Sequence, residues 1–129
     1  MNTTVITAAE GAPPAGHYSP ALRAGDFVFI SGQGPLDPAT GAIVPGTVAE
    51  QTALTLRNLA ALAEAAGGSL ADAVKVNAYL ADIADFAEFN ATYAATIQGT
   101  PPARTTVATG LAGISVEIDA ILYLPTDPA

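Results

Sequence analysis

Apolar residues between Thr47 and Gly68 recur every three or four positions, which predicts an amphipathic helix. Thr47 and Glu50 have the spacing of a capping box, so the helix is predicted to begin there. Gly67 and Gly68 are expected to end it, because glycine tolerates the left-handed conformation that follows many helices. The apolar stripe consists of Leu56, Leu59, Leu62, Ala63 and Ala66.

A second helix is predicted after Asp82, with Asp85 near the positive end of its dipole, and it ends before Gly99. Its inner stripe contains Phe86, Phe89, Tyr93 and Ile97. Asn90 falls inside this stripe, where an amide needs hydrogen-bond partners. The residue therefore either satisfies the adjoining backbone as a structural amide or belongs to a site.

Strands are predicted where polar and apolar residues alternate. Two are expected near residues 20–24 and 26–31, a third at 73–82, and a β-like run follows the two prolines before Arg104. In the third strand, one face carries Val74, Val76, Ala78 and Leu80, and the wetter face carries Lys75, Asn77 and Tyr79. In the last strand, at 114–124, Glu117 and Asp119 share a face about 7 Å apart. Its opposite face carries Ile114, Val116, Ile118, Ala120 and Leu122.

This order of elements, β, β, α, β, α, β, β, predicts an α+β fold in which both helices cover one face of the sheet. The 129 residues show no repeat, linker or charge block that would divide them. We therefore expect a single domain over residues 1–129.

Composition excludes several classes of function. The net charge is −8 and the four cationic side chains are scattered, so nucleic acid is not an expected partner. The chain has no cysteine and one histidine, which excludes thiolate sites and metal sites built on His and Cys spacing. No serine or aspartate is placed around His17 in a recognisable nucleophile elbow, so a familiar catalytic triad is not expected. No apolar run is long enough to span a bilayer and no signal peptide is recognisable, which predicts a soluble cytoplasmic protein.

The residues left to carry chemistry are Arg104, Glu117, Tyr18, Ser31 and Asn90. Spacing alone leaves an alternative for each. Arg104 could be a surface arginine paired with an acid on a neighbouring strand, including Glu117, and Glu117 could be a solvated residue of an edge strand. Tyr18 could pack its ring under a loop, and Ser31 could close a turn through its hydroxyl.

Several segments resemble the RidA family, also called YjgF, the reactive-intermediate deaminases. They are "HYSPAL", "FVFISGQGPLDPATGAIV", "EQTALTLRNLAALAEAAGGSLADAVKVNAYLADIADFAEFNATYA", "PPARTTV" and "VEIDAI", and the resemblance runs from about Tyr18 to Ile121. It implies a chorismate-mutase-like α+β fold, a mixed sheet covered on one face by two helices, and a homotrimer with its sites between subunits. It also implies hydrolysis of 2-imino or enamino acids, such as 2-iminobutanoate and 2-iminopropanoate, to 2-keto acids and ammonia, without metal or cofactor.

The resemblance also assigns roles to residues. Matching the family motifs one by one gives Arg104, Glu117, Tyr18, Ser31, Gly32 and Asn90, with Thr106 where many members carry cysteine. Arg104 is expected to bind the substrate carboxylate through two parallel hydrogen bonds. Glu117 is expected to position water and to act as general base or acid. His17 and Pro20 also depart from the family pattern, at the expected mouth of the site.

Two alternatives of other classes remain. The first is a non-catalytic, regulatory trimer that binds a 2-keto acid or similar small carboxylate as a signal in the same pocket. A measurement of turnover would distinguish it from the deaminase, because both would bind a carboxylate. The second is an endoribonuclease, a label that some relatives carry. The dispersed cations, the lone histidine and the 6% aromatic content argue against it.

Overall fold

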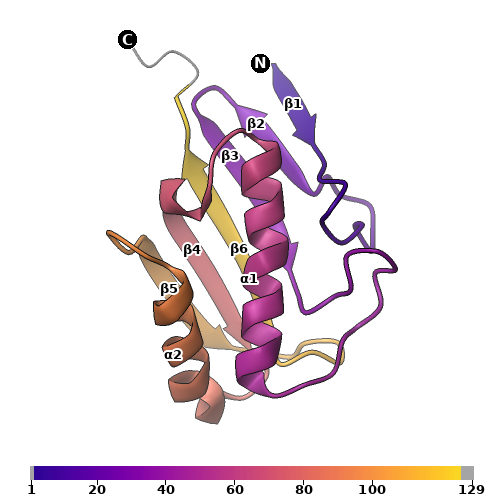
Figure 1. The fold of residues 1–129 in the computed structure, drawn as a ribbon, viewed down its shortest axis with the longest axis vertical. Helices are drawn as coiled ribbons and strands as arrows, with labels where there is room; N and C mark the ends of the chain where they lie inside the picture. Colours follow the sequence, from indigo (N-terminus) through magenta and orange to yellow (C-terminus); the bar gives the residue numbers. More distant parts are fainter. Residues whose placement is uncertain (1, 126–129) are drawn as a thin grey trace.

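The computed structural model describes residues 2–125, which form one mixed sheet of six strands and two α-helices (Figure 1). The elements are β1 (Thr3–Ile6), β2 (Ala21–Ala24), β3 (Phe27–Gln33), α1 (Val48–Ala65), β4 (Ala73–Leu80), α2 (Phe86–Thr96), β5 (Ala103–Ala108) and β6 (Val116–Tyr123). Single 3₁₀ turns at Leu70–Asp72 and Ile83–Asp85 precede β4 and α2. The strand order is β1-β2-β3-β6-β4-β5, and only the β4–β5 pair is parallel. The predicted α+β class is confirmed.

Both ends of α1 are formed as the sequence predicts. Thr47 Oγ1 accepts a hydrogen bond from the Glu50 amide at 3.1 Å, and Glu50 Oε1 accepts one from the Thr47 amide at 2.9 Å. At the other end Gly67 has φ +94°, and its N–H and that of Gly68 donate to carbonyls of the last turn. These paired bonds satisfy carbonyl groups that the helix leaves without partners.

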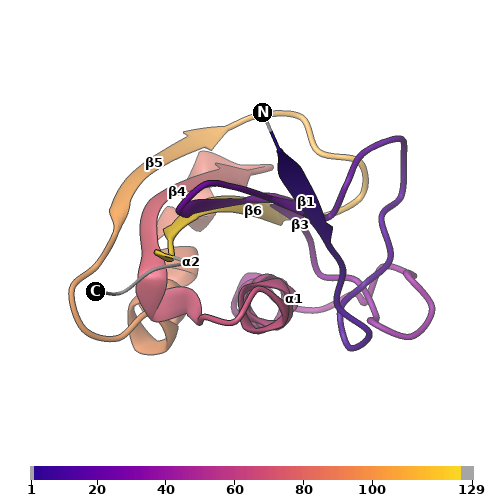
Figure 2. The same cartoon turned by 90° about the horizontal axis from the view of Figure 1, so that it is seen from above.

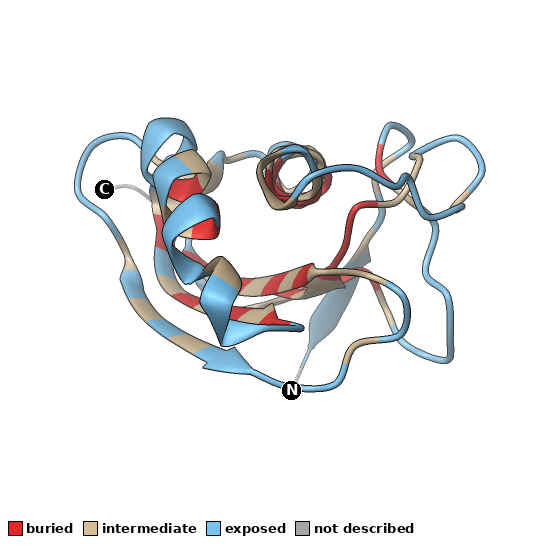
Figure 3. Ribbon diagram, turned by 90° about the horizontal axis from the view of Figure 1, so that it is seen from below, coloured by how far each residue is buried: buried red, intermediate tan, exposed pale blue. Residues whose placement is uncertain are grey.

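Both helices lie on the same side of the sheet (Figure 2). Buried residues lie on the sides of α1 and α2 that are turned toward the sheet, and they alternate with less buried ones along its central strands (Figure 3). The largest apolar side chains that are less than 2% exposed are Val28, Leu56, Leu59, Leu62, Val76, Leu80, Phe89, Val116, Ile118 and Leu122. The predicted layer arrangement is confirmed. Neither α1 nor α2 is long and apolar enough to cross a membrane, among the residues described.

No described helix covers the opposite face of the sheet, which we call the open face. Phe27, Phe29 and Tyr123 alternate with buried neighbours and project from this face, each between 41% and 47% exposed. Phe27 and Tyr123 pack against each other with ring centroids 5.5 Å apart. The open face therefore presents large apolar groups beside the polar side chains of β4 and β6.

The prediction that Val74 shares the buried face of β4 is wrong. The register against β6 shifts between Ala73 and Lys75, so a bulge turns Val74 outward at 45% exposure and Ala73 takes the buried place. The strand β1 was not predicted. It is a four-residue edge strand whose "TTVI" sequence is too short to show a period.

Candidate functional site

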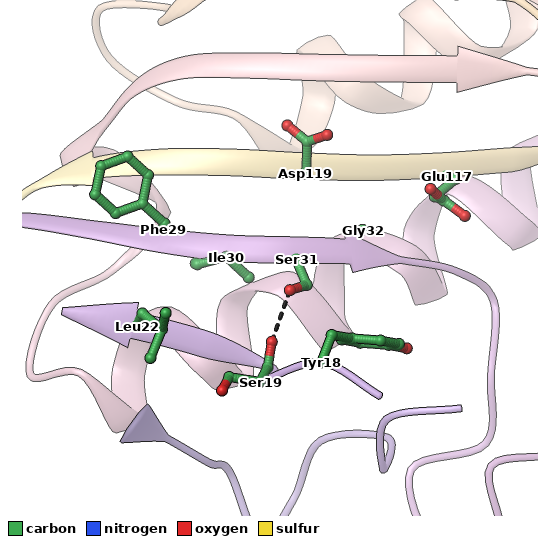
Figure 4. Close-up of a pocket in the computed structure, with 9 residues that line it drawn as sticks. All are labelled: Tyr18, Ser19, Leu22, Phe29, Ile30, Ser31, Gly32, Glu117 and Asp119. Atoms are coloured by element: carbon green, nitrogen blue, oxygen red, sulfur yellow. Dashed lines mark hydrogen bonds between the residues drawn. The ribbon is translucent and has the colours of Figure 1, made fainter. Parts of the chain in front are cut away.

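Four of the predicted site residues line one cavity of about 560 Å³ at the open face (Figure 4). They are Tyr18, Ser31, Gly32 and Glu117. Asp119, Ser19, Leu22, Phe29 and Ile30 complete the lining. The cavity thus has an acidic end on β6 and an apolar wall on β2 and β3.

A bulge in β3 brings Ser31 and Gly32 beside Glu117. The register against β6 shifts between Ile30 and Gln33, so neither Ser31 nor Gly32 has a partner position on β6. Ser31 Oγ donates to the Ser19 carbonyl at 2.7 Å, and this bond ties β3 to the segment that carries Tyr18. The Tyr18 hydroxyl accepts a hydrogen bond from the Ala15 amide at 3.0 Å, and its side chain is half exposed.

Gly32 leaves room for the Glu117 carboxylate. A Cβ atom at position 32 would lie 2.5 Å from Glu117 Oε2 and 2.9 Å from its carboxyl carbon. Both distances are shorter than any normal contact, so a side chain at position 32 would displace the carboxylate. No hydrogen bond from residues 2–125 holds Glu117 in another direction, and the carboxylate is available to the cavity.

We therefore expect Gly32→Ala to lower the kcat of any reaction that uses Glu117 by about 10- to 100-fold, because a displaced catalytic group loses its alignment. The free energy of unfolding should change little, since the group that must move is the end of a flexible side chain. Gly110→Ala is the matched control, because a Cβ there meets no atom within 4 Å and the backbone needs no positive φ. Equal kcat values for the two variants would contradict this role of Gly32.

The electrostatic environment of Glu117 favours proton exchange. Burial raises the pKa of the Glu117 carboxyl above its ordinary value, and the negative charge of Asp119 raises it further. Asp119 itself accepts hydrogen bonds from Asn77 Nδ2 at 2.8 Å and from the Tyr79 hydroxyl at 2.9 Å. Residues 2–125 hold no group of three or more His, Asp or Glu side chains that could bind a metal.

Arg104 and Asn90 line a different cavity, of about 490 Å³, between α2 and β5. The guanidinium carbon of Arg104 lies 4.6 Å from the ring centroid of Tyr93, 5.5 Å from that of Phe89 and 5.6 Å from that of Phe86. Aromatic faces attract a cation without neutralising it. No carboxylate of residues 2–125 pairs with Arg104, so the alternative of an Arg104–Glu117 ion pair is wrong within the chain.

Thr106 follows Arg104 on the same face of β5. Arg104 pairs with Val76 of β4 and Thr106 pairs with Ala78, both of which are buried under the helices. The Thr106 hydroxyl is buried and has no hydrogen-bond partner among the described residues, and it does not line the cavity of Arg104. The structure therefore does not place the Thr106 hydroxyl where a molecule in that cavity would contact it.

The two groups of residues cannot meet on one small molecule within a single chain. Arg104 faces the helices from β5, while Glu117 faces the opposite side from β6, and β4 lies between these strands. Their register positions on β4, at Val76 and Tyr79, differ by three residues. Strand spacing and rise then place the two Cα atoms roughly 14 Å apart, with side chains pointing away from each other.

Sequence reasoning missed two features of these cavities. The residues Phe86, Phe89 and Tyr93 were predicted only as a core stripe of the second helix, yet their rings surround the Arg104 guanidinium. The sequence places Asn77 and Tyr79 on the wetter face of their strand, and this polarity was the only sign in the sequence of their contact with Asp119. Their partner could be found only from the register between β4 and β6.

Comparison with known proteins gives a consistent result. The family described as endoribonuclease L-PSP matches residues 9–124. A RutC family protein of Pyrococcus horikoshii is 47% identical over 126 residues, covering 95% of this chain and 98% of that protein. A rat 2-iminobutanoate/2-iminopropanoate deaminase is 39% identical, covering 91% and 87%. The crystal structure of RidA from the Antarctic bacterium Psychrobacter sp. has a TM-score of 0.89 at 38% identity, covering 94% and 99%. The chain belongs to the RidA/YjgF family, whose sequence model bears the endoribonuclease L-PSP description.

Proposed function

We propose that this protein is a cofactor-independent imine and enamine deaminase that hydrolyses 2-imino acids, such as 2-iminobutanoate and 2-iminopropanoate, to 2-keto acids and ammonia. The observation that carries the proposal is the half-buried Arg104 guanidinium, which is fixed by three aromatic rings and left without an acidic partner in residues 2–125. Such a group binds a carboxylate through two parallel hydrogen bonds. The name of the rat relative supports the choice of substrate.

Glu117 supplies the proton transfers in the proposed reaction. The Glu117 carboxylate accepts a proton from water as the water oxygen attacks C2 of the protonated imine. The resulting carboxylic acid donates that proton to the amino nitrogen of the tetrahedral intermediate. The C–N bond then breaks and releases ammonia, while the Glu117 carboxylate accepts the hydroxyl proton, the C2 carbonyl forms and the proton passes to the ammonia. Both protons of the water end on the ammonium product, so the reaction needs no oxidant or cofactor.

We further propose that the site lies between subunits of a homotrimer, where Arg104 of one chain and Glu117 of another face the same substrate. The separation of the two residues across the sheet supports this arrangement, because one chain cannot direct both at a small molecule. The half-exposed aromatic residues of the open face also favour burial against another subunit.

The first experiment follows loss of 2-iminobutanoate, generated in situ by a threonine dehydratase, with and without the protein. The proposal expects faster loss of the imine than the spontaneous rate, and formation of the 2-keto acid. If the rate does not change, binding of 2-ketobutanoate is measured by calorimetry. Binding without turnover would contradict the deaminase and support a regulatory carboxylate-binding trimer.

A further inference from the structure

A hydrogen-bonded cluster lies beside Glu117 on the open face. Each carboxylate oxygen of Asp119 accepts one bond from β4: Oδ1 from Asn77 Nδ2 at 2.8 Å, and Oδ2 from the Tyr79 hydroxyl at 2.9 Å. Both donors are neutral, so the two hydrogen bonds fix the position of the carboxylate without cancelling its charge. The cluster therefore holds one negative charge in a fixed position.

This charge lies within reach of Glu117. The two residues are two positions apart on β6, which places them on one face about 7 Å apart. Both line the same cavity (Figure 4). Since both Asp119 oxygens already accept hydrogen bonds while Glu117 accepts none from residues 2–125, Asp119 is suited to act through its charge and Glu117 through proton transfer.

Within residues 2–125 of the same chain, the other elements packed around Glu117 bring no compensating cation. β3 contributes Ser31 and Gly32, and the segment before β2 contributes the phenol of Tyr18. β4 contributes Tyr79 and, farther away, Lys75. Lys75 is paired in register with Ile121 of β6, and its Nζ donates a hydrogen bond to Thr105 Oγ1 of β5 at 2.8 Å. No described salt bridge neutralises Asp119, so its charge acts on Glu117 directly.

We propose that Asp119 is a positioning residue of the site: held by Tyr79 and Asn77, its fixed negative charge favours uptake of a proton by the neighbouring Glu117 carboxylate. This inference rests on the proposed function of Glu117. Burial raises the pKa of Glu117 most, and the negative charge of Asp119 raises it further. The bond to Asp119 raises the pKa of Tyr79, which keeps the phenol protonated as a donor. A group whose pKa lies near the working pH transfers protons most effectively in both directions.

The test compares the pH dependence of kcat/KM for wild type, Asp119→Asn and Tyr79→Phe. Removing the Asp119 charge lowers the pKa of Glu117, so the limb of the profile governed by Glu117 should move to lower pH by about half a unit to two units. Tyr79→Phe removes a hydrogen bond from the same cluster but keeps the charge. Tyr79→Phe is therefore the control for a purely structural effect: a disturbed cluster would shift the pH profile in both variants, whereas loss of the charge would shift it only in Asp119→Asn. The comparison uses the position of the pH profile and does not depend on how far Tyr79→Phe lowers the rate.

A titration of the Glu117 carboxyl by NMR, in substrate-free protein, separates this inference from the proposed reaction. A pKa of Glu117 that is lower in Asp119→Asn than in Tyr79→Phe by at least about 0.3 unit supports the inference. A smaller difference overturns it, even if imine hydrolysis is observed. Absence of imine hydrolysis in wild type overturns the proposed reaction, and the titration still decides whether Asp119 controls Glu117.

Discussion

Arg104→Ala is expected to lower kcat/KM for 2-iminobutanoate by about 100-fold or more, because the substrate carboxylate loses both of its charge-assisted hydrogen bonds. The loss should appear as weaker binding and as poorer alignment of C2 with water. The fold should persist, because Arg104 lies on an edge strand and makes no ion pair within residues 2–125. Steady-state kinetics coupled to the dehydratase measures the effect, and circular dichroism checks the fold.

Two further variants sharpen this result. Arg104→Lys keeps the charge but not the planar, two-donor geometry, so its activity should remain far below that of wild type. Arg57→Ala removes a guanidinium group from the exposed side of α1 and should leave activity unchanged. If Arg104→Ala retained full activity, or if Arg57→Ala lost as much, the carboxylate-binding role of Arg104 would be wrong.

Glu117→Gln is expected to lower kcat by about 100- to 10,000-fold while KM changes little. Glutamine has the same shape, so the cavity and its contacts persist, but an amide neither accepts a proton from water nor returns one to nitrogen. Single-turnover kinetics and calorimetry with 2-ketobutanoate separate the chemical step from binding. Glu64→Gln, an exposed acid of α1, is the control. A large rise in KM with an unchanged kcat would show that Glu117 binds the substrate and takes no part in the chemistry.

The two inactive variants together test the location of the site. If Arg104 of one chain acts with Glu117 of another, a random one-to-one mixture of Arg104→Ala and Glu117→Gln chains contains complete sites. Roughly one site in four would then combine an intact arginine with an intact glutamate. Refolding or coexpressing the two variants should therefore restore about a quarter of the wild-type rate. A mixture that stays inactive, although the two variants form mixed assemblies, would contradict a site shared between Arg104 of one chain and Glu117 of another.

Local features of this fold could be predicted from the sequence. The ends of α1 follow from Thr47, Glu50 and Gly67, whose short-range bonds do not depend on the rest of the chain. The alternation in β6 likewise places Glu117 and Asp119 on one face. Such features are fixed by neighbours within a few residues, which is the range that sequence patterns describe.

Features that depend on distant segments could not be predicted. The bulge that turns Val74 outward arises from pairing between β4 and β6, and the sequence of β4 alone shows unbroken alternation. The separation of Arg104 from Glu117 depends on the strand order, which places β4 between them. The resemblance named both residues as matches to family motifs, but it did not show that one chain keeps them apart.

The sheet that separates Arg104 from Glu117 has a consequence for how the proposed activity depends on protein concentration. An enzyme whose site is contained in one chain keeps its turnover per chain at any dilution. Here each chain would carry halves of two different sites, so turnover per chain should decline once the protein is diluted below the dissociation constant of its assembly. A dilute, dissociated chain would then be correctly folded and yet inactive.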